Sequence, residues 1–183
     1  MKKIINMKSA KYLLVLFLAL NMLSCSNSDN EPIFVLSKAN LIGTYDMESM
    51  TLNTKTTTEV SGFPVVVNSN SVGSLFQIDL IFNSDDTYSI KGEYAVKTTT
   101  TSIGNSPIVN EQIIVINETG TYAVDNTDGT ISFTNQNAEL LTGKLMVSAI
   151  SENKLSLAQL LEEAIPSLNT TIEADLKISF IKE

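Results

Sequence analysis

The side chains that could do chemistry in this chain are few in kind. The sequence contains no histidine and a single cysteine, Cys25, so the Ser-His-Asp and Cys-His systems that activate a nucleophile cannot be assembled. Two adjacent carboxylate pairs, Asp85-Asp86 and Glu162-Glu163, could in principle supply the acid and base of glycoside hydrolysis. The first pair falls in an expected turn and the second on an expected helix surface, where a carboxyl group is not desolvated enough for its pKa to rise. We therefore predict no catalytic residue, no enzyme activity and no cofactor.

The remaining charged side chains narrow the choice of ligands. Asp125, Asn126 and Asp128 carry oxygen ligands suited to calcium, but the EF-hand pattern with its terminal Glu is not met, and we predict no metal site. All 12 basic residues are lysines, whereas 20 residues are acidic. Phosphate is commonly gripped by arginine forks, and nucleic-acid binders need a basic surface. The composition therefore argues against a nucleic-acid partner.

The first 24 residues are typical of a secretory signal. Residues 1–11 carry four lysines and no acidic residue. Residues 12–20 follow as an apolar run that is shorter than the ~20 residues a transmembrane helix needs. An N-terminal anchor helix and a buried core helix are the alternatives. We predict a signal peptide over residues 1–24.

Residues 23–25 (Leu-Ser-Cys) end this signal and resemble the lipobox of bacterial lipoproteins, with Met22 where that motif usually has Leu. The resemblance implies that Cys25 becomes the first mature residue and carries a lipid anchor such as palmitate. It places the protein at the outer membrane of a bacterial envelope, on the periplasmic face or the cell surface. Asp29 and Glu31 resemble the surface-export signals of Bacteroidota lipoproteins. Removing residues 1–24 leaves 8 lysines against all 20 acidic residues, a net charge of −12, so the lipid rather than the protein body is expected to bind the membrane.

Residues 76–96 show the clearest structural pattern. Apolar side chains occupy every second position from Phe76 to Phe82 and most second positions from Tyr88 to Val96, with polar residues between them. Such alternation gives a strand one core face and one solvent face. The turn-forming residues 83–86 (Asn-Ser-Asp-Asp) join the two runs, so we predict a β-hairpin.

The rest of the chain repeats this pattern. Further strands are expected from Leu41 onward, at residues 63–67 and 108–118, on either side of the Asp-Gly turn at 125–129, at 145–150 and 154–157, and at 172–180. Residues 68–73 are expected as a loop, 97–107 as a strand end running into a mobile loop, and 117–120 as a turn. The aliphatic run at 113–116 favours burial on both faces, or one face in the core and the other beneath a covering segment.

One short helix is expected near the C-terminus, over residues 156–165. Ser156 and Gln159 fit a capping box, and Pro166 is placed to end the helix. The alternative is a strand through Leu157 followed by a loop. The whole therefore predicts an all-β fold of about eight to ten antiparallel strands, and periodicity alone does not separate a sandwich from a barrel.

Four pieces of the sequence, taken in order, resemble bacterial lipocalin-like domains. They are Gly43 and Tyr45 in residues 43–45, the hairpin residues 82–88, Gly-Thr-Tyr at 120–122, and Lys-Leu-Ser-Leu at 154–157. The resemblance implies an up-and-down antiparallel β-barrel over residues 40–183, plugged at one end and open at the other, behind a flexible tether at 25–39. Tyr45 stands where the family has Trp, and the arginine that caps that Trp has no counterpart in a chain without arginine.

The leading functional expectation is that the barrel holds a small apolar or amphipathic ligand. The side chains expected to point inward and line that pocket are Phe76, Ile78, Tyr88, Tyr94, Tyr122 and Phe133. The alternative is that these side chains fill the barrel as a solid core. The protein would then be a non-catalytic lipoprotein that acts through contacts of its outer surface with a partner.

Overall fold

The computed structural model describes residues 34–135 and 140–183. The expected signal peptide, Cys25 and most of the tether lie outside these residues, so the lipid anchor stays a prediction. Within the described ranges, no helix is long and apolar enough to cross a membrane.

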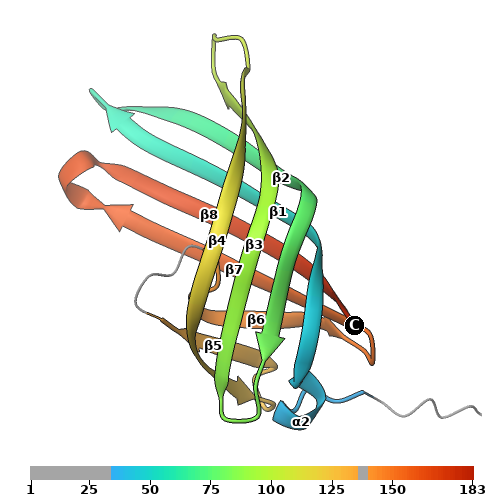
Figure 1. The fold of residues 1–183 in the computed structure, drawn as a ribbon. Coiled ribbons are helices and arrows are strands. Elements are labelled where there is room, and N and C mark those ends of the chain that lie inside the picture. Colours follow the sequence, from blue (N-terminus) through green and yellow to red (C-terminus); the bar gives the residue numbers. More distant parts are fainter. Residues whose placement is uncertain (1–33, 136–139) are drawn as a thin grey trace, which may run out of the picture. The chain divides into compact units, whose positions relative to one another are not determined.

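Eight antiparallel strands form one sheet whose two ends meet (Figure 1). In chain order they are β1 (Gly43–Val60), β2 (Phe63–Phe82), β3 (Thr87–Ser102), β4 (Ile108–Asp125), β5 (Thr130–Thr134), β6 (Gly143–Ile150), β7 (Lys154–Ile165) and β8 (Thr170–Lys182). Each strand pairs with the next one in the sequence, and β8 returns to β1 and closes the ring. The expected all-β, antiparallel class is confirmed.

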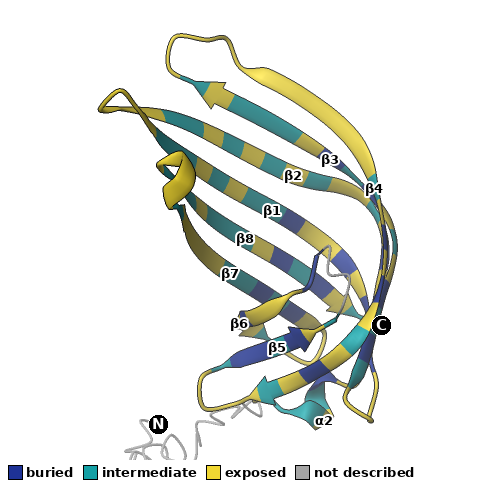
Figure 2. Ribbon diagram, turned by 90° about the vertical axis from the view of Figure 1, so that its left-hand side faces the viewer, coloured by how far each residue is buried: buried dark blue, intermediate teal, exposed yellow. Residues whose placement is uncertain are grey.

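The ring has a closed end and an open end. At the closed end lies the short helix α2 (Lys38–Leu41), where Leu41 is fully buried and Lys38 forms an ion pair of 2.6 Å with Asp86 in the β2–β3 turn. Buried residues concentrate there, whereas the strands that reach the open end are mostly exposed or half-buried (Figure 2). The core therefore occupies one half of the ring.

Two strands lack a neighbour along part of their length, because β5 and β6 are short. β5 has 5 residues, and its pairing with β4 covers only Thr121–Asp125 of that strand. β6 has 8 residues and pairs with β7 only from Leu155 to Ala158. Among the described residues, the open-end parts of β4 and β7 are therefore sheet edges. We call residues 108–120 the β4 edge.

The hairpin predicted over residues 76–96 is confirmed, and the structure gives its register. Leu80 pairs with Ile90 and Phe82 with Tyr88, and all four side chains are at most 1% exposed. Gly92 lies opposite Ile78, just after a register shift in β2. Its φ is 134°, and a Cβ there would lie 1.8 Å from the carbonyl oxygen of Gln77. Only glycine fits this close approach of two backbones.

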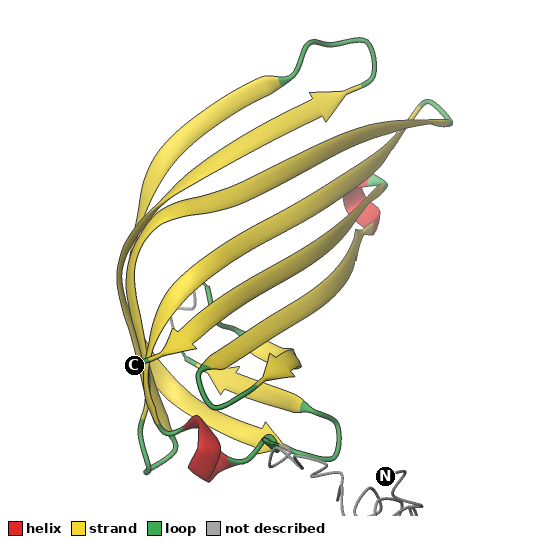
Figure 3. Ribbon diagram, turned by 90° about the vertical axis from the view of Figure 1, so that its right-hand side faces the viewer, coloured by secondary structure: helices red, strands yellow, loops and turns green. Residues whose placement is uncertain are grey.

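The helix expected over residues 156–165 is wrong. These residues belong to β7, which pairs with β8 as far as Ile165 opposite Thr170 (Figure 3). A helix of ten residues has little stability of its own. In the ladder, β8 supplies backbone hydrogen bonds and Leu157 is buried in the core, so tertiary pairing overrides the helix propensity. Pro166 opens the 3-10 turn η2 (Pro166–Leu168) instead of ending a helix.

Three expected loops or turns are also strand. Residues 68–73 and 117–120 lie inside continuous β2 and β4, and β3 runs to Ser102, so the β3–β4 loop covers only 103–107. Polar composition misled the prediction. Residues 68–73 and the end of β3 lie on a part of the sheet that is exposed or half-buried on both faces, whereas in 117–120 the inward position is taken by the buried carboxylate of Glu118. The burial expected for residues 113–116 is wrong in part: Ile116 is buried, but Ile113 and Val115 are 68% and 66% exposed on the outer face.

Candidate functional site

The residues expected to line a ligand pocket lie together at the closed end. Ile78, Tyr88, Tyr94, Tyr122 and Phe133 are each at most 5% exposed. Phe76 is partly buried above them and stacks on Tyr94, with 5.8 Å between the ring centroids. The structure thus assembles the six residues, while their role as ligand contacts stays a prediction.

Phe82 is the centre of this aromatic cluster. Its ring centroid lies 4.8 Å from that of Tyr122, 5.8 Å from Tyr45 and 6.1 Å from Phe133. The first two contacts are edge-to-face, the geometry that aromatic pairs prefer. The Tyr122 hydroxyl donates to the carbonyl of Asn83 at 2.9 Å. The chain itself therefore uses a polar group that a ligand would otherwise contact.

At the closed end Tyr45 contacts the side chain of Lys182, a residue that the sequence did not single out. Lys182 pairs with Tyr45 across β8 and β1, and its Nζ lies 5.3 Å from the centroid of the tyrosine ring. The same Nζ donates to the carbonyl of Asn40 at 3.0 Å, and the Tyr45 hydroxyl donates to that carbonyl at 3.3 Å. The sequence could have predicted that Lys182 points inward, because it continues the alternation of the inward-facing Ile178 and Phe180.

Replacing Lys182 with methionine is expected to lower the free energy of unfolding by about 1–2 kcal/mol, since the change removes a cation–π contact and a charged hydrogen bond. Lys177→Met on the same strand is the matched control. Its ion pair with Asp175 is exposed, so it should change stability by less than about 0.5 kcal/mol. Urea titration followed by circular dichroism gives both values. Equal losses of stability in the two variants would show that Lys182 does not stabilise the closed end through Tyr45 and Asn40.

Alkaline pH is expected to weaken the closed end. Burial, with Tyr122 as the smaller cause, raises the pKa of Tyr45 to about 12. Burial also raises the pKa of Tyr88 and of Tyr122. A proton held more tightly in the folded state stabilises the fold below the unfolded pKa of about 10, and this stabilisation is lost as the pH rises further.

We therefore expect the free energy of unfolding to fall between pH 10 and 12, by up to about 3 kcal/mol for Tyr45. Urea titrations at several pH values measure this fall. Tyr45→Phe keeps the ring and removes the titrating group, so its stability should decline less steeply over the same interval. An identical decline in the variant would show that Tyr45 is not the group responsible.

Glu118 is a buried carboxylate that the sequence analysis placed in a turn. It is 3% exposed on β4, and its Oε1 accepts a hydrogen bond of 2.6 Å from the backbone N–H of Leu140. Its Oε2 accepts from Asn135 at 3.3 Å. Donors of the chain itself thus hold the carboxylate, which fixes Leu140 and the fully buried Leu141 over the core.

The carboxylate pairs considered for catalysis do not form joint sites. Asp85 accepts from both the N–H and the hydroxyl of Thr87, and these bonds lower the pKa of its exposed carboxyl group. Glu162 and Glu163 are neighbours on β7 and therefore point to opposite faces of the sheet.

The side-chain oxygens around Asp125, considered above as calcium ligands, form hydrogen bonds and an ion pair at the β4–β5 turn. The Asp125 carboxylate accepts from the backbone N–H groups of Thr127 and Asp128, and Asp128 pairs with Lys144 at 2.8 Å. In the part of the chain that the structure describes, no three acidic, His or Cys side chains converge as metal ligands.

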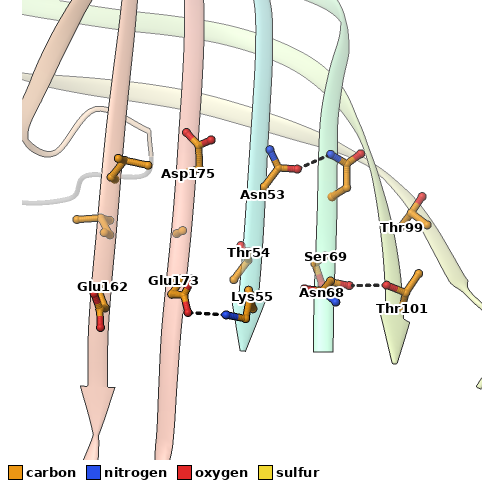
Figure 4. Close-up of a pocket in the computed structure, with 14 residues that line it drawn as sticks. Asn53, Thr54, Lys55, Asn68, Ser69, Thr99, Thr101, Glu162, Glu173 and Asp175 are labelled. Carbon is orange, nitrogen blue, oxygen red and sulfur yellow. Dashed lines mark hydrogen bonds and ion pairs between the residues drawn. The ribbon is translucent and has the colours of Figure 1, made fainter. Parts of the chain in front are cut away.

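A polar groove of about 820 Å³ crosses β7, β8, β1, β2 and β3 near the open end (Figure 4). Asn53 and Lys55 alternate with the inward Leu52 and Thr54, so the groove lies on the outer face. Asn70 donates to Asn53 at 2.7 Å, and Lys55 lies 2.8 Å from Glu173. None of the six expected ligand residues lines it. Leu160 and Leu161 also line the groove, so it offers apolar as well as polar contacts, and a polar group bound there would have to replace these internal pairs.

The inner face of the open half is rich in hydroxyl groups. Ser71 and Thr98 are bonded at 2.8 Å, Ser69 and Thr100 at 3.0 Å, and Thr58 and Thr170 at 2.9 Å. These residues continue the inward alternation above Phe76 and Tyr94. The walls above the aromatic core are thus partly polar and bonded to one another.

Comparison with known proteins adds no identification. No family model, no curated protein and no solved structure matches this chain.

Proposed function

We propose that this protein is an envelope-anchored, lipocalin-like lipoprotein that works by non-covalent interaction through its outer surface and sheet edges. The carrying observation is the filled closed end: five of the six expected ligand residues are at most 5% exposed and pack into one core. This favours the interaction role over carriage of an apolar molecule. Proteins of this architecture can be filled or hollow, so fold alone does not decide between the two.

Three features support the lipocalin-like assignment. The strands follow one another around the ring, helix α2 lies at one end, and the other end flares open. Lys182 lies over Tyr45 where the family has an arginine over a tryptophan. The missing arginine is thereby replaced by a lysine of the last strand.

The lipid anchor at Cys25 has a direct test. Cells that express the full-length protein are grown with an alkyne analogue of palmitate, and the protein is isolated and its label measured. The parent should carry the label and sediment with the outer membrane, whereas Cys25→Ser should do neither. An unlabelled, soluble parent would refute envelope anchoring.

A second candidate function is the binding of an amphipathic molecule at the boundary between the core and the open half. The stacked pair Phe76 and Tyr94 favours it, because Phe76 is only partly buried. An apolar tail could rest on this pair while polar atoms met the hydroxyl groups of the walls. Phe76→Ala should then abolish binding of a fatty acid measured by calorimetry, and absence of binding to the parent would exclude this function.

A further inference from the structure

The β4 edge is a long strand edge with few of the features that block pairing with another strand. From Ile108 to Gly120 it pairs with β3 on one side, and the described residues place no strand on the other. At its end at residues 118–120, Asn135 and Leu140 pack against its inward-facing residues. Of the devices with which natural proteins block edge pairing, it contains no Lys, no Pro and no register shift, and its charged residues are Glu111 and the inward-pointing Glu118. Ile113 and Val115 also expose about two-thirds of their surface, at 68% and 66%. Such an edge is a template for another strand.

The second free edge, on β7, is different. It carries Glu162 and Glu163 and is followed directly by Pro166. Charged residues and proline discourage strand addition. On the β4 edge, Glu111 is the outward charge, and Lys97 neutralises it at 3.3 Å. The β4 edge is therefore the pairing surface.

The ladder with β3 determines which groups the β4 edge presents. The N–H of Tyr122 donates to the carbonyl of Asp86 on the β3 side at 2.8 Å. The β3–β4 register is regular from Thr87 opposite Thr121 to Thr100 opposite Ile108. Hydrogen-bonding direction alternates along a strand, so the odd-numbered residues of β4 point their N–H and C=O groups away from β3. An added antiparallel strand must place its own edge-facing residues opposite these.

A second copy of the chain meets this requirement. The edge runs from Ile108, the first residue of β4, to Gly120, next to the first residue that β5 covers. Its midpoint is Ile114. An antiparallel pairing centred there covers the whole edge of both copies and sets odd residues opposite odd residues. We propose that two copies associate by pairing their β4 edges around a two-fold axis at Ile114.

The side chains are complementary in this register. On the outer face, each Ile113 lies opposite Val115 of the other copy, and Glu111 lies opposite Asn117. No two like charges face each other anywhere along the edge. A two-fold interface must be self-complementary, and cross-strand pairs of β-branched side chains stabilise a sheet. The interface covers the exposed apolar pair and completes the backbone ladder.

This inference deepens the proposed interaction role by naming the partner, and it does not depend on the lipid anchor. Its test uses full-length acylated protein in detergent, oxidised with copper phenanthroline and run on a non-reducing gel. Ile114→Cys should give a disulfide-linked dimer, because opposite residues in a non-hydrogen-bonded pair have Cα atoms about 4.5 Å apart. Acylation blocks the only other cysteine, Cys25.

Gln112→Cys is the matched control, on the same strand and the same face. In the proposed register Gln112 lies opposite Ile116, so the two Gln112 positions are about 13 Å apart, beyond the roughly 7 Å limit for a disulfide. Dimer from Ile114→Cys and none from Gln112→Cys supports the proposal. Equal yields, or none from either, overturn it. A disulfide-linked dimer from the parent would show instead that Cys25 carries a free thiol, which refutes the lipid anchor. The same two variants are then compared in the Cys25→Ser background, where the same pair of outcomes supports or overturns the pairing.

Sedimentation velocity supplies a measurement independent of cross-linking. The double variant Ile113→Lys, Val115→Lys should sediment as a monomer at concentrations where the parent is a dimer. Because both positions are exposed, its urea midpoint should match that of the parent at dilutions where the parent is monomeric, and it should lack the rise with concentration that dimerisation gives the parent. A parent that stays monomeric at all concentrations overturns the proposal. If a photo-cross-linker at Val115 then gives a single adduct with another protein, the edge binds a different partner.

Discussion

Phe82→Ala is expected to lower the free energy of unfolding by about 3–5 kcal/mol, the range found when a buried Phe is cut back in a close-packed core. Phe82 is 1% exposed and contacts the rings of Tyr45, Tyr122 and Phe133. Its removal leaves a cavity walled by these rings. Urea unfolding followed by circular dichroism measures the loss.

The same variant reports on whether the closed end is filled. An apolar cavity of this kind stays dry and can bind benzene, so benzene should raise the melting temperature of Phe82→Ala and leave the parent unchanged. Phe63→Ala is the control, because Phe63 is 74% exposed and its loss should cost less than about 0.5 kcal/mol. A small effect at Phe82, or stabilisation of the parent by benzene, would indicate a hollow interior.

Gly92→Ala is expected to lower the free energy of unfolding by about 3 kcal/mol or more. The change adds the cost of a positive φ at a non-glycine residue to a clash of the new Cβ with the carbonyl oxygen of Gln77 at 1.8 Å. The backbone of β2 or β3 must move to relieve it, and that movement disturbs Ile78 in the core.

Gly104→Ala separates the two contributions. Gly104 also has a positive φ, 80°, but a Cβ there would have no atom within 4 Å. Only the conformational cost applies, so the expected loss is about 1 kcal/mol. Equal losses at the two glycines, measured by urea titration, would mean that β2 and β3 are not as close at Gly92 as the structure has them.

The alternation of apolar and polar residues correctly predicted strands in those parts of the fold where each strand has one buried face. Residues 76–96 and the last strand have apolar side chains on the face that points to the core, so their spacing predicted that both are strands. At the open end the same strands have two wet faces. Residues 68–73 carry no apolar period there, and only pairing with a neighbouring strand shows that they are strand. Residues 117–120 lie beside the core instead, but their inward positions hold the buried Glu118 and Gly120, which lies against the Tyr88 ring, so they show no apolar period either.

Long-range pairing also explains the other differences. The helical pattern of residues 156–165 is local, whereas the ladder with β8 that overrides it is not. Lys182 and Glu118 have partners that are distant in sequence, Tyr45 and Leu140. The six expected ligand residues do point inward, but spacing gives the direction of a side chain and not the space beyond it. Whether they line a pocket or fill a core depends on packing.

The most direct test of the filled closed end is native mass spectrometry of the protein from Ser26 to Glu183, incubated with a fatty acid, a sterol and a hydrophobic dye. A filled closed end predicts only the mass of the polypeptide, as monomer and dimer, and no change in melting temperature with any of the three. One ligand per chain, released on denaturation and accompanied by a higher melting temperature, would contradict it.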